Sequence, residues 1–374
     1  MYKLIALAAT INKHINNLCT NVWPGFTPVP FILYNDNTRI AVGDKWPKEY
    51  IRIHDGIWAA NGYDSQLMGN TAITYHGIPV AIWDTRTWPC DVDIAQAASS
   101  VAHEMFHAFQ WANMAIPHAN ELLLPQYPHS ALSVALIIEE NMWLAQLCKN
   151  RDMIPECLVK IAALRRQREA EVGTIFMEYD KYCESEEGTA AYFEVHTEAH
   201  ITGRSPFECA GYYSALLQDT TKLLPSYRHR CYAAGLILCL ACDIMWPGWQ
   251  TRWQESGRTI FDWIAGCLTA DEPDATISPA SIKTASGILA AYRKENEQKI
   301  SRFMSQPLAS IDGDIRLLSF DPMNLVCSNG RCLHIGGRLC INGEERVQTA
   351  PFLTEYGDTI LDIKRFFYRP DTQK

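Results

Sequence analysis

Apolar residues repeat with a helical period at the start of this chain and over much of its middle, and with a strand period near both ends. Near the N-terminus five of them recur at intervals of three and four residues: Leu4, Ala8, Ile11, Ile15 and Leu18. This spacing predicts an amphipathic first helix. The segment 22–25, Val-Trp-Pro-Gly, interrupts the pattern and predicts the end of that helix.

Short apolar segments typical of strands follow at residues 30–34, 50–53, 71–75 and 78–83. His76 and Gly77 separate the last two segments and predict a tight turn between them. We therefore expect a sheet in this part of the chain. Pro79 stands near the start of its segment, which is typical of an edge strand, and a free edge binds an extended peptide through main-chain hydrogen bonds.

Helical periodicity dominates from residue 131 onward, at residues 131–150, from 154 to about 183, around Glu187, and at 227–246 and 279–304. The charged run 165–169 lies within the second of these segments, and we expect it to be a solvated helix face. The small residues 233–235 predict that their helix packs closely against another backbone.

The periodicity changes after residue 306. Asn329-Gly330 and Asn342-Gly343 each stand between two strand-like runs, which is a strong hairpin signal. The sequence thus predicts an α+β protein with a main domain at residues 1–306 and a small antiparallel β unit at residues 307–374.

The apolar run 100–110 contains the pattern His-Glu-x-x-His, at His103, Glu104 and His107. On a helix the two histidines share a face, so both imidazoles reach one metal ion, and the glutamate is placed to act on a metal-bound water. Asp91 or Asp93 caps this helix, whose apolar residues cover more than one face. Ionisable side chains in such a buried helix require a partner, and Zn²⁺ suits two imidazoles and a carboxylate.

A second segment, residues 184–194, carries the pattern Glu-Gly-x-Ala-x-Tyr-x-Glu from Glu187 to Glu194. Together with the His-Glu-x-x-His motif it resembles the gluzincin branch of zinc metallopeptidases. Residues 69–84 also resemble the strand pair that precedes the active-site helix in those proteins. The resemblance covers residues 30 to 250. It implies a zincin-like fold, with a sheet and an active-site helix followed by a mainly helical part, and it makes Glu187 the third metal ligand.

The interval from His107 to Glu187 is far longer than in thermolysin-like enzymes. Glu139 and Glu140 lie closer in sequence, on a helix that is apolar on one side. They remain alternatives for the third ligand.

Further side chains are candidates for supporting roles. A hydrolase of this kind needs a donor for the developing oxyanion, and Tyr232, His229 and Tyr192 are available. Glu194 lies two turns beyond Glu187 and is placed to hold a zinc-binding histidine through its free N–H. His196 and His200 form another pair four residues apart, but no glutamate follows His196, so we read them as a surface or structural pair.

Composition limits the partners. Of the 374 residues, 48% are hydrophobic and 20% are charged, which is ordinary for a soluble globular protein. The formal charge of -9 argues against nucleic acid, because phosphate binding needs a basic face. We expect no membrane span, since no apolar run approaches the required length of about 20 residues.

The 13 cysteines have no framework spacing, and the start of the chain lacks a convincing export signal. They predict reduced thiols in a cytoplasmic protein. A second zinc site at Cys327, Cys332, His334 and Cys340 is an alternative to two hairpins with buried thiols.

The sequence as a whole predicts a zinc-dependent peptidase in which His103, His107 and Glu187 hold the metal and Glu104 is the general base. Tyr232 is the first choice for the oxyanion donor. The chain has no Gly-x-Met-Glu-Asn segment of the kind that zinc aminopeptidases use, so we expect an endopeptidase acting on a peptide or protein. A zinc-binding interaction module without turnover, or a zinc hydrolase acting on another bond, would have the same ligands. The sequence does not indicate an oligomeric state.

Overall fold

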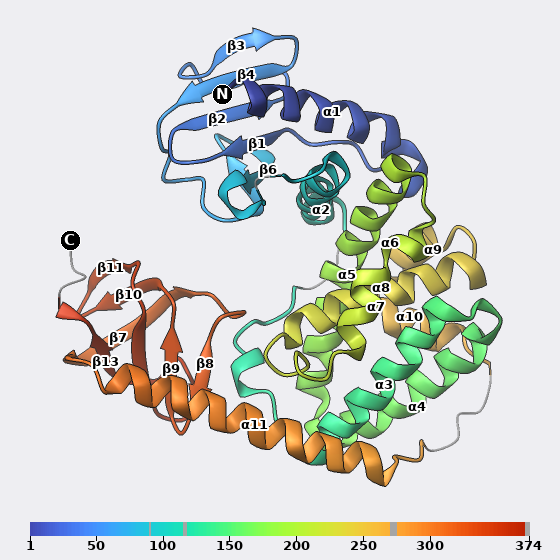
Figure 1. The fold of residues 1–374 in the computed structure, drawn as a ribbon, viewed down its shortest axis with the longest axis vertical. Helices are drawn as coiled ribbons and strands as arrows, with labels where there is room; N and C mark the ends of the chain where they lie inside the picture. Colours follow the sequence, from blue (N-terminus) through green and yellow to red (C-terminus); the bar gives the residue numbers. More distant parts are fainter. Residues whose placement is uncertain (90, 115–117, 270–274, 371–374) are drawn as a thin grey trace.

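The computed structural model describes residues 1–89, 91–114, 118–269 and 275–370, apart from the side chains of residues 19–21. This part of the chain is α+β, as predicted, with two sheets and a large helical body between them (Figure 1). The α-helices are α1 (Tyr2–Val22), α2 (Ile94–Asn113), α3 (Ala131–Lys149), α4 (Ile154–Val172), α5 (Thr174–Thr202), α6 (Pro206–Cys209), α7 (Gly211–Gln218), α8 (Tyr227–Met245), α9 (Trp249–Ser256), α10 (Ile260–Cys267) and α11 (Pro279–Met304). Short 3-10 helices lie at Thr85–Thr87, Leu124–Gln126 and Arg151–Met153.

The first sheet has the strand order β3-β4-β2-β1-β6-β5, and only its β1–β6 pair is parallel. Its strands are β1 (Phe31–Tyr34), β2 (Thr38–Val42), β3 (Ile51–His54), β4 (Ile57–Asn61), β5 (Thr71–Tyr75) and β6 (Ile78–Asp84). The edge strands are therefore β3 and β5. The prediction that the strand of Pro79 is an edge strand is wrong, because β6 lies between β1 and β5. Pro79 pairs with Thr74 and precedes the part of β6 that pairs with β1, so its missing N–H breaks no ladder.

Helices α1 and α2 cover one face of this sheet (Figure 1). The apolar residues that predicted α1, among them Ile11 and Ile15, are buried there together with Phe31 and Leu33 of β1. Residues of the opposite face, such as Ile32 and Tyr34, pack in a second small core. Because both faces are covered, β1 and β2 are buried along their whole length.

Helix α5 crosses α8 at an unusually short distance. A Cβ added to Gly188 would lie 2.4 Å from Cα of Gly235, and one added to Gly235 would lie 2.1 Å from the carbonyl oxygen of Glu184. Only residues without a side chain permit this approach. The close packing predicted from the small residues 233–235 is thus confirmed, and it sets α8 directly against the segment of α5 that carries Glu187.

The charged run 165–169 forms the solvated face that we expected only at Arg166. The helical conformation is interrupted at Gly173, which separates α4 from α5. Arg165 and Arg168 of α4 are both buried. They share Glu140 with Arg230, and the cluster is completed by Glu184 and Asp180. Periodicity alone cannot distinguish a charge that faces water from one that faces a buried counter-charge. The cluster joins α3, α4, α5 and α8, and removing one partner of such a buried pair costs about 3–5 kcal/mol.

The second sheet, which we call the C-terminal sheet, has the order β11-β10-β7-β13-β12-β9-β8 and is antiparallel. Its strands are β7 (Ala309–Phe320), β8 (Val326–Ser328), β9 (Arg331–His334), β10 (Gly337–Ile341), β11 (Glu344–Gln348), β12 (Phe352–Tyr356) and β13 (Ile363–Tyr368). Both predicted hairpins are confirmed, and Asn329 and Asn342 adopt the positive φ that their turns require. Helix α11 runs from the helical body to this sheet (Figure 1).

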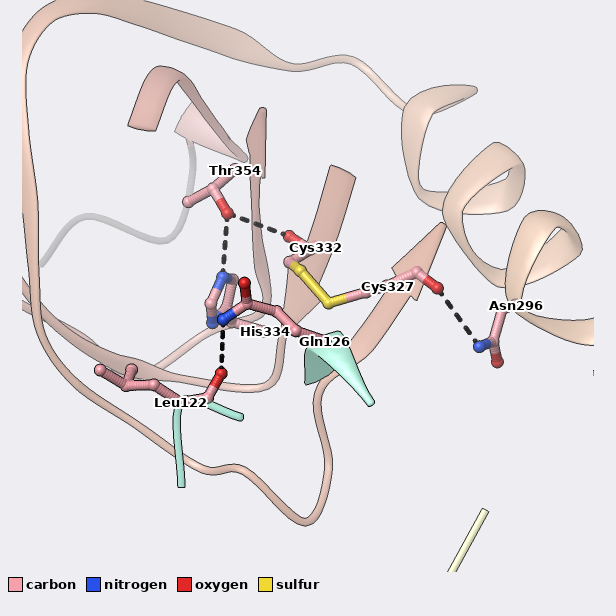
Figure 2. The surroundings of a disulfide bond; sticks show 7 residues. All are labelled: Leu122, Gln126, Asn296, Cys327, Cys332, His334 and Thr354. Atoms are coloured by element: carbon pink, nitrogen blue, oxygen red, sulfur yellow. Dashed lines mark hydrogen bonds between the residues drawn. A yellow bond between two sulfur atoms is a disulfide. The ribbon is translucent and has the colours of Figure 1, made fainter. Parts of the chain in front are cut away.

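Cys327 and Cys332 form a disulfide across the β8–β9 hairpin (Figure 2). This pair departs from the prediction of reduced thiols. His334 lies beside it, and its Nε2 is 3.0 Å from Oγ1 of Thr354 (Figure 2). Cys327 and Cys332 were two of the four ligands in the alternative of a second zinc site. Their sulfur atoms are bonded to each other and are not available to a metal.

By length and composition α3 could cross a membrane, contrary to our expectation that no segment would. In the fold, 61% of its apolar window is buried, as in the core helix of a soluble protein.

Candidate metal centre

Helix α2 brings the first two candidate ligands into the core. The carboxylate of Asp93 accepts a hydrogen bond from the backbone N–H of Gln96 at 2.8 Å and caps the helix, one of the two caps that the sequence offered. His103, Glu104 and His107 are each less than 10% exposed. Both histidines reach carboxylates of α5, and Phe106 of the same helix stacks on Phe193 of α5.

Glu187 of α5 completes a triangle with the two histidines. Its Oε2 lies 3.1 Å from Nε2 of His107 and 3.5 Å from Nε2 of His103, and the two Nε2 atoms are 3.1 Å apart. A tetrahedral zinc site with bonds of about 2.0–2.2 Å places neighbouring ligand atoms roughly 3.3–3.6 Å apart. The three atoms are therefore spaced as ligands of a single ion.

The outer hydrogen bonds of the histidines determine which ring nitrogens are free. Nδ1 of His107 is 2.7 Å from Oε1 of Gln110, whose amide nitrogen donates to the carbonyl of Glu186 and to Thr189. The amide orientation is thus fixed, and its oxygen requires a donor, so Nδ1 of His107 carries the proton. In the same way Nδ1 of His103 donates to Oε2 of Glu194 at 3.0 Å. In the neutral rings both Nε2 atoms then present lone pairs to one another, an arrangement that a shared cation satisfies.

Charge in the site also favours a cation. Burial lowers the pKa of His103, but hydrogen bonds to Glu187 and Glu194 outweigh this effect and raise it to about 10. Burial raises the pKa of Glu187, yet His107, His103 and Arg228 hold it well below its usual range. The pKa of Glu104 is raised, chiefly because the side chain is buried. The carboxylates thus favour positive charge at the two rings. A proton on His103 carries this charge in the metal-free site, and a bound ion would displace that proton.

Arg228 at the start of α8 fixes the orientation of the proposed third ligand. Its Nη2 donates to Oε1 of Glu187 at 2.7 Å and its Nε to Glu121 at 2.8 Å. Because Oε1 is held by the guanidinium, only Oε2 faces the histidines. Arg228 also donates to the hydroxyl of Tyr232, whose ring stacks on that of His103 with centroids 5.8 Å apart. Tyr232 is thus beside the ligands, as an oxyanion donor must be.

The remaining candidates lie elsewhere. Tyr192 donates to Asp243 and packs among tryptophans of the main core, so it is not a donor for this site. Glu139 accepts a hydrogen bond from Ser281 of α11, and Glu140 belongs to the buried arginine cluster, so neither alternative for the third ligand is near the histidines. His229 is exposed, but its ring centroid is 5.7 Å from that of Tyr232.

Sequence reasoning missed Gln110, Arg228 and Tyr213, whose hydroxyl donates to Glu194 at 2.9 Å. Gln110 had a detectable signal, because it follows His107 by three residues on the same helix face. Tyr213 and Arg228 had none, since only the packing of α8 against α5, and of α7 against α8, brings them here. Within the described ranges, one group of His, Cys, Asp or Glu side chains is close enough to hold a metal ion: His103, His107 and Glu187. Their ligand atoms lie within 4.8 Å of one another.

No protein-family model, curated protein or solved structure matches the chain.

Proposed function

We propose that this protein is a zinc-dependent peptidase of gluzincin type, in which His103, His107 and Glu187 hold the metal. One observation carries the proposal: two histidine lone pairs and one carboxylate oxygen converge at the spacing of a tetrahedral site, and each is fixed by an outer hydrogen bond. Two imidazoles with one carboxylate are ligands that zinc accepts, and three protein ligands leave a fourth position for water or substrate. The first sheet and α2 would correspond to the zincin-like part of the fold.

Each neighbouring side chain has a chemical role in this proposal. Bound zinc supplies the Lewis acidity that lowers the pKa of a coordinated water toward neutrality. Glu104 takes the proton of the attacking water and later delivers it to the nitrogen of the leaving amine. The hydroxyl of Tyr232 accepts from Arg228 and is hydrogen-bonded to Glu187, so in this proposal its hydrogen turns from Glu187 to the carbonyl oxygen of the substrate as negative charge develops there.

The substrate in this proposal is a peptide or protein segment in extended form. Edge strand β5 packs against α2, and its free edge offers main-chain groups to such a segment. The endopeptidase reading still rests on the missing aminopeptidase segment alone. For the cell compartment we keep the cytoplasm, because nine described cysteines are free, although the Cys327–Cys332 disulfide does not support it.

The proposal is tested by replacing Glu104 with glutamine. Glutamine keeps the volume of the side chain but cannot accept a proton near neutral pH, so turnover should fall by roughly 100-fold to 10,000-fold while zinc content and fold stay the same. Wild type and variant are assayed on one peptide mixture read by mass spectrometry, with Glu344→Gln, whose side chain is 78% exposed on the C-terminal sheet, as the matched control. Equal rates in all three proteins would mean that another protein performs the cleavage. Zinc binding without any cleavage would favour the interaction module.

A further inference from the structure

A cavity of about 190 Å³ lies between the helical body and the C-terminal sheet. Its walls come from three places: the 3-10 helix at Leu124–Gln126, the start of α8 at residues 226–229, and the loop 322–325 that precedes β8. An apolar cavity of roughly 150 Å³ holds a benzene ring, so this space is large enough for an aromatic side chain.

The cavity adjoins the candidate metal centre through two residues of α8. Arg228 lines the cavity and also binds Glu187, and its Nη1 is 3.9 Å from Sδ of Met323 in the loop 322–325. His229 lines the cavity and lies one ring contact from Tyr232, which itself stacks on His103. The ring centroids of His229 and Tyr232 are 5.7 Å apart, and those of Tyr232 and His103 are 5.8 Å apart. A few residues of extended peptide, at about 3.3–3.6 Å per residue, span the distance from His229 to His103.

The charges of the wall restrict what the cavity accepts. No carboxylate lines it within the described residues, and its one permanent cation, Arg228, is paired with Glu187 and Glu121. Burial, together with Arg168 and Arg293, lowers the pKa of His129 to about 4. The pKa of His229, whose side chain is exposed in part, is lowered by partial desolvation and by Arg228. Both imidazoles are therefore neutral at pH 7. A lysine or arginine side chain would find no carboxylate here to balance its charge. An uncharged side chain would find hydrogen-bonding groups of Ser226 and Asn324 and apolar contacts from Leu325.

We infer that the C-terminal sheet supplies one wall of the substrate-binding site, and that this cavity receives an uncharged side chain of the peptide, up to the size of an aromatic ring. The inference rests on the proposed function for the identity of the ligand as a peptide. A second space of about 450 Å³ shares Pro225, Tyr292 and Met323 with the first and continues along the C-terminal sheet. The loop 322–325 is thus a specificity element rather than a connection between two independent parts.

The inference is tested by binding, in the Glu104→Gln background, so that its outcome does not depend on turnover. Fluorescent peptides of one scaffold carry Phe or Lys at each position in turn, and anisotropy gives their affinities. At one position the Phe peptide should bind at least about tenfold more tightly than the Lys peptide, because the buried ammonium is unpaired.

Ser226→Asp should then change this preference. Ser226 is the N-cap of α8 and makes no side-chain capping bond, so aspartate is compatible with the helix and adds a carboxylate to the cavity wall. The Lys peptide should gain about fivefold in affinity, as expected of one partly exposed ion pair. Ser278→Asp makes the same change at the N-cap of α11, away from the cavity, and should leave the preference as it was.

Met323→Ala tests the contribution of the C-terminal sheet directly. It should weaken binding of the Phe peptide several-fold, while Met68→Ala, at a position that is 67% exposed in the loop between β4 and β5, should not. An unchanged preference in both Ser226→Asp and Met323→Ala would overturn the inference. If these variants respond but the protein with Glu104 intact cleaves no peptide, the proposed function fails while the binding site stands.

Discussion

Replacing Gly235 with alanine tests how the metal-binding side chains are held in place. The added methyl group would lie 2.1 Å from the carbonyl oxygen of Glu184 and 2.8 Å from Cα of Gly188. Ordinary contacts of a Cβ atom begin at 3.4 Å, so α5 and α8 must separate by about 1 Å. Neither atom can move by a side-chain rotation, because both belong to the backbone of α5.

The expected loss of stability follows from two opposing effects. Overpacking of a close interface costs about 1–3 kcal/mol, and this contact is tight enough to reach the upper value. Alanine regains about 1 kcal/mol relative to glycine within a helix. We therefore expect a net destabilisation of about 2 kcal/mol. Metal affinity should fall as well, because Glu187 precedes Gly188 and metal–ligand distances tolerate deviations of only about 0.2 Å.

Urea unfolding measures the first effect, and competition with a zinc chelator measures the second. The matched control is Gly287→Ala in α11, where no atom lies within 4 Å of the added methyl group and only the gain of about 1 kcal/mol remains. If Gly235→Ala is as stable as Gly287→Ala and holds zinc as tightly as the wild type, the glycine crossing does not position the site.

Two further predictions concern the third ligand and the C-terminal sheet. Glu187→Ala should strongly weaken zinc binding in a chelator titration, because one of three protein ligands is lost, whereas Glu139→Ala should leave it nearly unchanged; the reverse result would refute the long-range assignment. Burial lowers the pKa of His334 to about 4, below the value of about 6.5 in the unfolded chain, so its contribution to stability is complete above pH 6.5 and is lost as the pH falls toward 4. Between pH 7 and pH 4 the free energy of unfolding of the wild type should fall by about 3 kcal/mol more than that of His334→Gln, as measured by urea unfolding. Equal decreases in the two proteins would show that His334 is not the cause.

The sequence predicted those features that depend on local spacing. Helix α1 follows from its apolar period, the β8–β9 and β10–β11 hairpins follow from Asn-Gly, and the shared face of His103 and His107 follows from their separation by four residues. Each of these signals lies within a few residues of the chain, where backbone geometry alone relates the positions.

The features that the sequence did not reveal depend on tertiary packing. The burial of Arg165 and Arg168 requires counter-charges from α3 and α5, and a charged run shows the same pattern whether it faces water or carboxylates. Arg228 and Tyr213 reach the site only because α8 packs against α5 and α7 packs against α8. The position of Glu187, 80 residues beyond His107, came from a resemblance to known peptidases, and no spacing rule would have provided it.

The most direct test of the metal centre is the zinc content of the protein purified without chelators, measured by elemental analysis. We predict one tightly bound zinc per chain, which should be absent from Glu187→Ala. Two zinc ions per chain would restore the alternative of a second site at the cysteines of the C-terminal sheet, with Cys327 and Cys332 reduced. Protein that carries no stoichiometric metal and acquires none from added zinc would contradict the proposed centre and the peptidase activity that depends on it.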